Sequence, residues 1–197
     1  VQLMAIEHKD SDILVLMAQN PVVSENVCDI LLAINKIKID EKLAANPIIS
    51  QKTQQMLYSR IYRTSDYDYD DSVRKQLCKN ENLHEDIFDQ LVSKTKYHED
   101  LLCNPSIGKF DHGVIYNELN TSSGGIFRMF SRPKYLENPG LSEKLQSVII
   151  DKNKDAVHHL NHIANNPSLA PSQQTILSQN VDLDVLLNLI KNPASTY

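Results

Sequence analysis

The sequence predicts an all-α fold: a short right-handed α-solenoid of about six to seven repeats, each made of a helix, an Asn-Pro turn and a second helix. An Asn-Pro pair recurs along the chain, apolar residues stand at fixed distances from its asparagine, and the composition suits short helices. Trp is absent, Gly occurs only 5 times and aromatic residues make up 6% of the chain, which disfavours a β-sandwich. We expect a single helical-repeat domain over residues 1–197, either as a whole protein or as a fragment of a larger one.

The Asn-Pro pair marks the centre of each predicted repeat, which we call an Asn-Pro unit. One copy, Asn80-Glu81, lacks the proline but keeps the apolar residues on either side. Positions in a unit are counted from the turn asparagine, which is position 0. The turn asparagines are Asn20, Asn46, Asn80, Asn104, Asn138, Asn166 and Asn192.

Three positions of the unit are filled by apolar residues or tyrosine. Position −3 holds Met17, Leu43, Leu77, Leu101, Tyr135, Ile163 and Leu189. Position +3 holds Val23, Ile49, Leu83, Ile107, Leu141 and Leu169. Position +11 holds Leu31, Leu57, Leu91, Ile115, Ile149 and Leu177. With a hydrophobic content of 41%, chance would not fill these columns so consistently, and we expect their residues to form the core.

The turn itself has a physical explanation in the sequence. A first helix is expected to end at the asparagine, because a residue before proline is pushed away from the right-handed helical conformation. Asparagine also tolerates the left-handed conformation that closes many helices. Ser24, Ser50 and Ser142 stand at position +4, where each can cap the second helix. Since such a pair of helices cannot bury its own apolar face, neighbouring units are expected to stack.

The repeated pattern Leu-x-x-Asn-Pro-x-[Ile/Leu/Val]-Ser is complete in Leu43–Ser50, and Ile163–Leu169 follows it with Ile in the place of Leu and without the final Ser. The pattern resembles the bacterial variant leucine-rich and HEAT-like α-helical repeat proteins, over residues from about 10 to 193. This resemblance implies an α-solenoid with a binding role. It also implies a place in a larger bacterial protein or assembly, such as a secretion machine or a secreted effector.

Charge and cysteine content narrow the classes of function. The net charge of −5 and the pI of about 5.8 argue against a nucleic-acid partner, which would normally require a basic face. Cys28, Cys78 and Cys103 show no CxxC spacing, so neither a disulfide framework nor a structural zinc site is expected. We predict that they are buried thiols in a reducing compartment. Since no apolar run reaches the roughly 18 residues of a membrane span, a cytoplasmic location is expected.

The second and fourth intervals between asparagines are longer by about eight residues, and such inserts often lie on the binding face of a repeat array. The first insert, residues 60–71, places Tyr67 and Tyr69 among carboxylates, and tyrosine is enriched at interface hot spots. Its alternating aspartates begin like an EF-hand loop, but Asp71 takes the glycine position and Leu77 the glutamate position, so no calcium site is assigned. The alternative is an acidic loop that leads into a helix at Ser72.

The second insert, residues 121–134, combines a Ser/Gly stretch with apolar and basic residues. It provides further candidates for partner binding, which are Phe127, Arg128, Met129, Phe130 and Arg132. The alternative is an extra helical turn whose Phe127 and Phe130 pack into the core. Because one ordinary repeat separates the two inserts, we expect both to project from one side of the array.

One segment carries several histidines at helical spacing. Over residues 155–164 this spacing predicts an apolar face and an opposite face with Asp155, His158, His159 and His162. His158 and His162 stand at i and i+4, a spacing that can chelate a transition metal. HExxH is absent, and a solvated polar face explains the same pattern. No metal is therefore assigned, and the three histidines are expected to be exposed.

No common catalytic motif is present, since GxSxG, the P-loop and GxGxxG are all missing. The sequence therefore predicts a non-enzymatic scaffold or adaptor that binds another protein and needs no cofactor. Two alternatives stay open. One is a helical-repeat protein that binds nucleic acid, and the other is a metal-binding enzyme that uses His158, His159 and His162. The sequence does not predict the oligomeric state.

Overall fold

The computed structural model of the protein describes residues 10–60, 69–110, 115 and 133–195. Within these residues every regular element is a helix and no strand is present, so the predicted all-α class is confirmed. The chain divides into two compact parts, which we call the N-terminal body (Val1–Tyr97) and the C-terminal body (His98–Tyr197). The prediction of a single domain over residues 1–197 stays a prediction.

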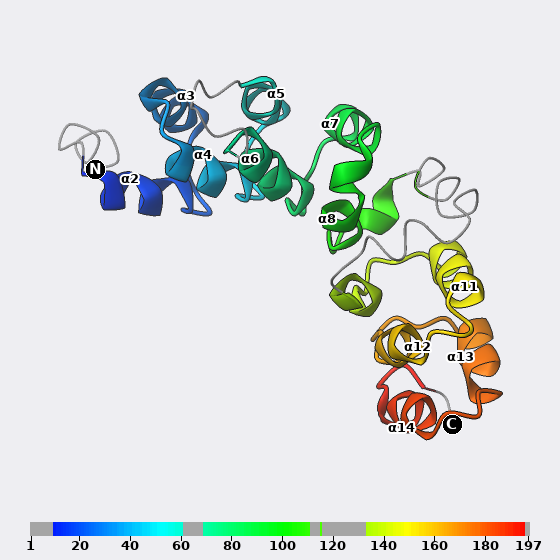
Figure 1. The fold of residues 1–197 in the computed structure, drawn as a ribbon. Coiled ribbons are helices and arrows are strands. Elements are labelled where there is room, and N and C mark those ends of the chain that lie inside the picture. Colours follow the sequence, from blue (N-terminus) through cyan, green and yellow to red (C-terminus); the bar gives the residue numbers. More distant parts are fainter. Residues whose placement is uncertain (1–9, 61–68, 111–114, 116–132, 196–197) are drawn as a thin grey trace. The chain divides into compact units, whose positions relative to one another are not determined.

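The N-terminal body contains two rows of helices (Figure 1). The first helices of its Asn-Pro units are α2 (Ser11–Ala18), α4 (Ile37–Ala44) and α6 (Tyr69–Cys78). The second helices are α3 (Glu25–Ile34), α5 (Gln51–Ser59) and α7 (Glu85–Val92), after which the short 3-10 helix η1 spans Thr95–Tyr97. Helix α4 contacts both α2 and α6, and α5 contacts both α3 and α7. First helices therefore pack on first helices, and second helices on second helices.

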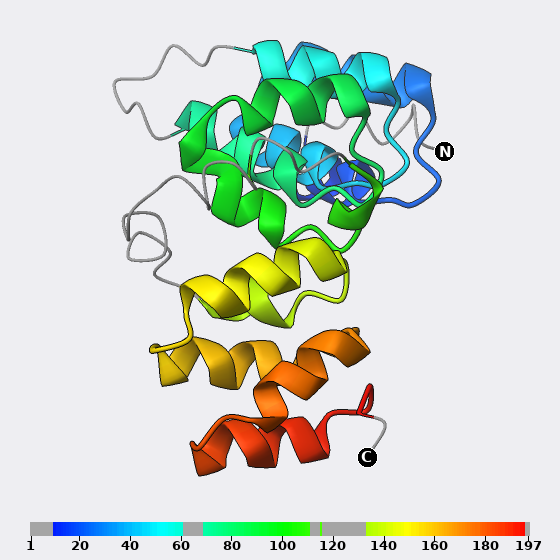
Figure 2. The ribbon, with the colours of Figure 1, turned by 90° about the vertical axis from the view of Figure 1, so that its right-hand side faces the viewer.

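The C-terminal body follows the same order of elements. Its first helices are α8 (His98–Leu102), the 3-10 helix η3 (Pro133–Glu137), α12 (Val157–Ala164) and α14 (Leu183–Lys191). The segments after the turns are the 3-10 helix η2 (Ile107–Lys109), α11 (Glu143–Lys152) and α13 (Pro171–Ser178). η3 contacts α8 and α12, α12 contacts α14, and α11 contacts α13. Figure 2 shows α11 in yellow at one end of this series, α12 and α13 next to it in gold and orange, and α14 in red at the other end.

The predicted apolar columns form the core. At positions −3, +3 and +11 every residue is buried apart from Met17, which is partly exposed in the first unit. Within one unit, Leu43, Ile49 and Leu57 are 0%, 5% and 1% exposed. The prediction that these three side chains are buried is therefore confirmed.

Asparagine side chains cross-link successive turns within each body. The Nδ2 of Asn46 donates to the carbonyl oxygens of Ala18 (2.8 Å) and Asn20 (2.9 Å), at positions −2 and 0 of the preceding unit. Its Oδ1 accepts from the backbone N–H of Ile48 at 3.2 Å. Equivalent pairs of donor bonds, 2.5 to 2.9 Å long, come from Asn80, Asn138, Asn166 and Asn192. Each of these buried amides therefore satisfies its hydrogen-bonding groups by holding two turns in register.

Glutamines at position +8 also cross-link the turns. Each of them binds the following unit, whereas each turn asparagine binds the preceding unit. The Nε2 of Gln54 donates to the carbonyl oxygens of Ile49 (3.3 Å) in its own unit and Asn82 (3.0 Å) in the next. Its Oε1 accepts from the backbone N–H of His84 at 2.9 Å. The same donor pattern is made by Gln146 and Gln174. This column was not predicted, although its constant distance from the asparagine is visible in the sequence.

The ends of the helices correct three local predictions. Ser50 and Ser142 cap their helices by accepting from backbone N–H groups, but Ser24 makes no such hydrogen bond. Helix α6 begins at Tyr69 rather than at Ser72. Among the described non-glycine residues only Asn35 has a positive φ, of 54°. The turn asparagines are therefore not left-handed, and their cross-links explain their presence instead.

Two further predictions concern the burial of the cysteines and the absence of a membrane span. Cys28 and Cys78 are buried as predicted, but Cys103 is exposed, which contradicts the prediction of three buried thiols. The reason is that Cys103 stands at position −1, where Gln19, Ala45 and Asn165 are also exposed. Among the helices of the described segments, none has the length and apolar character that a membrane crossing requires.

Candidate functional site

The residues predicted to bind a partner are not placed by the structure. Tyr67, Phe127, Arg128, Met129, Phe130 and Arg132 lie outside the described residues. Tyr69 is the first residue of α6, but its side chain also lies outside the described part. The prediction that both inserts project from one side therefore stays a prediction.

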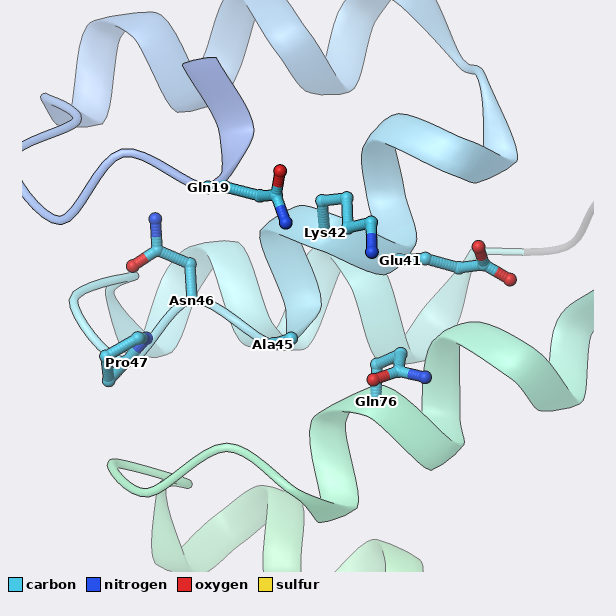
Figure 3. A pocket seen from close by; sticks show the side chains of 7 residues that line it. All are labelled: Gln19, Glu41, Lys42, Ala45, Asn46, Pro47 and Gln76. Carbon is cyan, nitrogen blue, oxygen red and sulfur yellow. The ribbon is translucent and has the colours of Figure 1, made fainter. Parts of the chain in front are cut away.

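The candidate site is a pocket on the outer surface of the first helices in the N-terminal body. It has a volume of about 230 Å³ and is open to solvent (Figure 3). Figure 3 shows side chains from three successive first helices around it. Its lining residues are Gln19, Glu41, Lys42, Ala45, Asn46, Pro47 and Gln76.

Packing of the first helices explains why these residues meet. Lys42 and Gln76 both stand at position −4, and Gln19 and Ala45 both stand at position −1. The last residue before one turn therefore lies beside position −4 of the next unit. Because positions −1 and −4 are close on one side of a helix, they form a continuous outer surface, which we call the first-helix surface.

The polar side chains of the pocket are available for a ligand. Those of Gln19, Glu41, Lys42 and Gln76 make no hydrogen bond or ion pair with any residue that the structure describes. They offer a carboxylate, an ammonium group and two amides, so both donors and acceptors are present. Asn46 differs from them, because its amide is used by the turn. The pocket is therefore suited to recognising polar groups of either charge.

The equivalent positions of the C-terminal body bring Glu137 and His162 together. Glu137 stands at position −1 and His162 at position −4, and their Oε1 and Nδ1 atoms are 2.7 Å apart. The ring of His158 meets that of His162 edge-on, with centroids 4.8 Å apart. The first-helix surface thus carries a different polar group in each body.

The histidines are only in part where the sequence analysis expected them. His158 is exposed as predicted, but His159 and His162 are partly buried. His162 faces Glu137 because α12 packs against η3. The Nδ1 of His159 is buried and has no hydrogen-bond partner among the described residues. Burial, and the nearby His158 and His162, lower the pKa of His159. In the described segments no three His, Cys, Asp or Glu side chains are arranged to hold a metal ion.

Charged residues at both ends of the first insert point into the N-terminal body. Arg60 donates from Nη1 to Oδ2 of Asp40 at 2.6 Å and from Nη2 to the carbonyl oxygen of Leu32 at 2.7 Å. Asp71 accepts at Oδ1 from Lys96 (2.6 Å) and Tyr97 (2.9 Å). Both residues therefore hold helices together. The sequence predicted neither contact: both residues were placed in the first insert, and Asp71 also in an acidic loop that leads into a helix.

Competing effects set the pKa of Asp71. Its partial burial acts to raise the pKa, but the hydrogen bonds from Lys96 and Tyr97 and the charges of Lys96 and Lys75 act to lower it. The net result is a pKa below the usual value for aspartate. Asp71 is therefore a structural anion that stays charged at neutral pH.

The ring of Tyr58 is close to two cations. The guanidinium carbon of Arg74 is 5.4 Å from the ring centroid and the Nζ of Lys94 is 5.5 Å from it. The hydroxyl of Tyr58 donates to the carbonyl oxygen of Gln90 at 3.3 Å, and Nε of Arg74 donates to the carbonyl oxygen of Tyr58 at 3.0 Å. These contacts join α5, α6 and α7 and leave the tyrosine little freedom to anchor a partner.

Comparison of the chain with protein-family models, with curated proteins and with solved structures gives no match in any of the three.

Proposed function

We propose that the chain is a short α-solenoid that acts as a non-enzymatic scaffold or adaptor and binds another protein along the first-helix surface. The observation that carries this proposal is the set of polar side chains around the pocket that have no partner among the described residues. A surface whose hydrogen-bonding groups are used by water alone can exchange them for those of a partner. The predicted inserts would add contacts outside the described part.

The cross-linked turns support the solenoid. Asparagine side chains repeat the same pair of hydrogen bonds between neighbouring turns, although the intervening segments differ in length. In stacked-repeat proteins each unit contacts its neighbours through one recurring interface, and the extended surface that results is used for binding. A fixed register would keep positions −1 and −4 of successive units at constant spacing.

The chemistry of the pocket favours binding over catalysis. Glu41 is its one carboxylate, and its other polar side chains are an ammonium group and amides. Covalent catalysis requires a nucleophile held against a base, and neither the Glu41 nor the Lys42 side chain makes a hydrogen bond or ion pair with a described residue. The presence of Glu41 next to Lys42 also gives the pocket no excess of positive charge for nucleic acid.

Two observations bear on the cellular setting of the chain. The resemblance to bacterial helical-repeat proteins favours a role in a bacterial assembly, such as a secretion machine or an effector. The free cysteines support a reducing compartment such as the cytoplasm, because a disulfide framework is typical of secreted proteins.

A charge reversal in the pocket tests the proposed surface. The wild-type chain and the Lys42→Glu variant would be used as bait in cell extract of the native host, and proteins captured by the wild type would be measured by mass spectrometry. The matched control is Lys52→Glu, since Lys52 is also exposed but lies on α5 and pairs with Asp29 at the surface. We expect Lys42→Glu to reduce capture of a specific protein at least tenfold and Lys52→Glu to leave it unchanged.

Direct binding of the captured protein, purified, decides the result. If its affinity is the same for the wild type and for Lys42→Glu, the first-helix surface is not the binding site. If the wild type captures nucleic acid, and the capture disappears at high salt, the nucleic-acid alternative replaces the scaffold. Circular dichroism of both variants shows whether either substitution unfolds the chain.

A further inference from the structure

Two histidines lie one helical turn apart on α12, inside the C-terminal body. His158 and His162 stand at i and i+4, and their ring centroids are 4.8 Å apart with the ring planes at 89°. Two imidazoles that bind one metal ion at about 2.0–2.1 Å from each nitrogen have ring centroids about 5 Å apart. The separation of the two rings therefore suits a two-histidine chelate.

Glu137 determines which nitrogen of His162 is free. Its Oε1 is 2.7 Å from Nδ1 of His162, and in the neutral ring this hydrogen bond places the proton on Nδ1. Nε2 then keeps its lone pair and can bind a metal ion. Histidine ligands of metal ions usually donate their second nitrogen to a carboxylate in this way, which orients the ring and increases its basicity. A helix face that only meets solvent does not need such a contact from the neighbouring unit.

Both rings are open to a ligand. His158 is exposed, and the side chain of His162 is 27% exposed. His158 makes no hydrogen bond or ion pair with a described residue, and His162 makes one only with Glu137. The carboxylate of Glu137 also places a negative charge beside the rings, which favours a cation. His159 differs from both, because its Nδ1 is buried.

We propose that a ring nitrogen of His158 and Nε2 of His162 bind a divalent transition-metal ion, with Glu137 as the positioning residue behind His162. Imidazole ligands favour copper, nickel and zinc over calcium and magnesium, and copper binds most tightly among the divalent ions. The His158 ring can rotate toward the ion, since no hydrogen bond to a described residue holds it. Because no three side chains of the described segments are arranged around one metal, water would fill the remaining coordination positions.

This site goes beyond the proposed binding of another protein. It uses two ring nitrogens of the C-terminal body, and metal binding is measured with the chain alone. The site can therefore fail without affecting the test at Lys42, and a failure of that test leaves the metal site standing.

Titration calorimetry of the tag-free 197-residue chain tests the site. After treatment with a chelator, the chain at about pH 7.5 should bind one copper ion, zinc more weakly and calcium not at all. His158→Gln and His162→Gln should each weaken copper binding at least tenfold. Binding should also weaken at about pH 5.5, because an imidazole ligand must be neutral.

Two further positions separate ligands from their surroundings. His159→Val is the matched control, since His159 is adjacent in sequence but has a buried Nδ1, and this variant should bind copper like the wild type. Glu137→Leu should weaken binding about tenfold, and Glu137→Gln less, because glutamine still accepts from Nδ1. The paramagnetic resonance spectrum of bound copper should keep two imidazole nitrogens in Glu137→Leu and show one in His158→Gln. This difference distinguishes a positioning residue from a ligand.

Three results would overturn the inference. Copper that does not bind the wild type below about 100 µM excludes the site. An affinity unchanged in both His158→Gln and His162→Gln places the ion elsewhere on the chain. An equal loss in His159→Val shows that the assigned pair is wrong. Circular dichroism of all variants excludes unfolding as the cause.

Discussion

The two bodies hold their turns together with the same asparagine bonds but add different chemistry to them. The N-terminal body adds ion pairs, which are Lys52–Asp29 (2.9 Å), Arg60–Asp40 (2.6 Å) and Lys96–Asp71 (2.6 Å). The C-terminal body has a histidine–glutamate contact, His162–Glu137 (2.7 Å). Its amide cross-links at Gln146 and Gln174 are also present in the N-terminal body, at Gln54.

This difference separates what the fold requires from what it tolerates. Asparagine recurs at position 0 in both bodies because no other side chain of its length offers two donors and an acceptor to the neighbouring backbone. The remaining contacts only need to be satisfied locally, so charged, amide and imidazole groups can replace one another. We therefore expect the two bodies to respond alike to loss of an asparagine and differently to loss of a charge or to a change in pH.

Breaking the buried ion pair should have the largest effect. In Arg60→Met the carboxylate of Asp40, which is 0% exposed, loses the guanidinium that lies 2.6 Å from it, and this should lower the free energy of unfolding by about 3–5 kcal/mol. The double variant Asp40→Leu with Arg60→Met should recover most of the loss, since Leu14 and Leu160 occupy the same position −6. Urea unfolding of the three proteins measures both effects. A double variant no more stable than Arg60→Met would mean that the site needs its charges.

Loss of one turn asparagine should come next. Asn46→Ala removes two donor bonds and leaves two carbonyls without their partner, so stability should fall by about 2–4 kcal/mol. Asn166→Ala, in the C-terminal body, should cost about the same. The control is Asn20→Ala, whose side chain makes only a local hydrogen bond and should cost below about 1 kcal/mol. Equal losses for Asn20 and Asn46 in urea unfolding would contradict the cross-linking role.

Replacing His159 should change how the stability of the C-terminal body depends on pH. Because the pKa of His159 is lower in the folded chain than the usual 6.5, folding favours the neutral ring. The contribution of His159 to the stability of the fold is therefore fully present above pH 6.5. It is lost as the pH falls through the lower pKa that His159 has in the folded chain. His159→Val introduces the residue that Val73 and Val185 provide at the same position −7, and it should reduce the loss of stability between pH 7 and pH 5. The measurement is the urea midpoint of the wild type and of His159→Val at pH 7 and at pH 5. If the midpoint falls by the same amount in both proteins, His159 does not contribute to the pH dependence.

The smallest effect concerns the thiols and leaves stability unchanged. Burial, and then the charges of Glu25 and Asp29, raise the pKa of Cys28 to about 11, so its thiol stays protonated at pH 8. Cys78 is buried, whereas Cys103 is exposed. A thiol reagent should therefore label one cysteine rapidly in the native chain, and Cys103→Ser should abolish that rapid phase. Rapid labelling that persists in Cys103→Ser would show that the N-terminal body opens readily.

The sequence was informative where burial follows a fixed spacing. Apolar residues at positions −3, +3 and +11 could be identified as core because their burial depends on their own side chains and on helical periodicity. The asparagine at position 0 was recognised, but its role was assigned to local backbone conformation. Its true partners lie in another turn, 26 residues away in the case of Asn20 and Asn46. Such a contact depends on tertiary packing, which a single sequence does not specify.

The candidate site shows the same limit more strongly. Gln19, Lys42 and Gln76 are unremarkable polar residues on helices, and only the packing of three units brings them around one pocket. The inward turn of Arg60 and the contact of His162 with Glu137 also depend on the neighbouring helix. His162 was predicted to be exposed because imidazole groups on a polar helix face are usually solvated, and no contact was predicted for Arg60.

The length of chain between joined turns has a consequence for how such a protein can change in size. Asn46 joins the carbonyl of Asn20 across 26 residues and Asn80 joins that of Asn46 across 34, yet the bonds are 2.9 Å and 2.8 Å long. The hydrogen bonds between two turns therefore do not depend on the number of residues between them. A longer connecting segment adds only a small entropic cost of loop closure. Insertions after a second helix, and duplication or deletion of whole units, should then leave each turn asparagine paired with the carbonyl oxygens of the turn before it. A gene for this chain could gain or lose length in whole steps while every remaining turn keeps its partner.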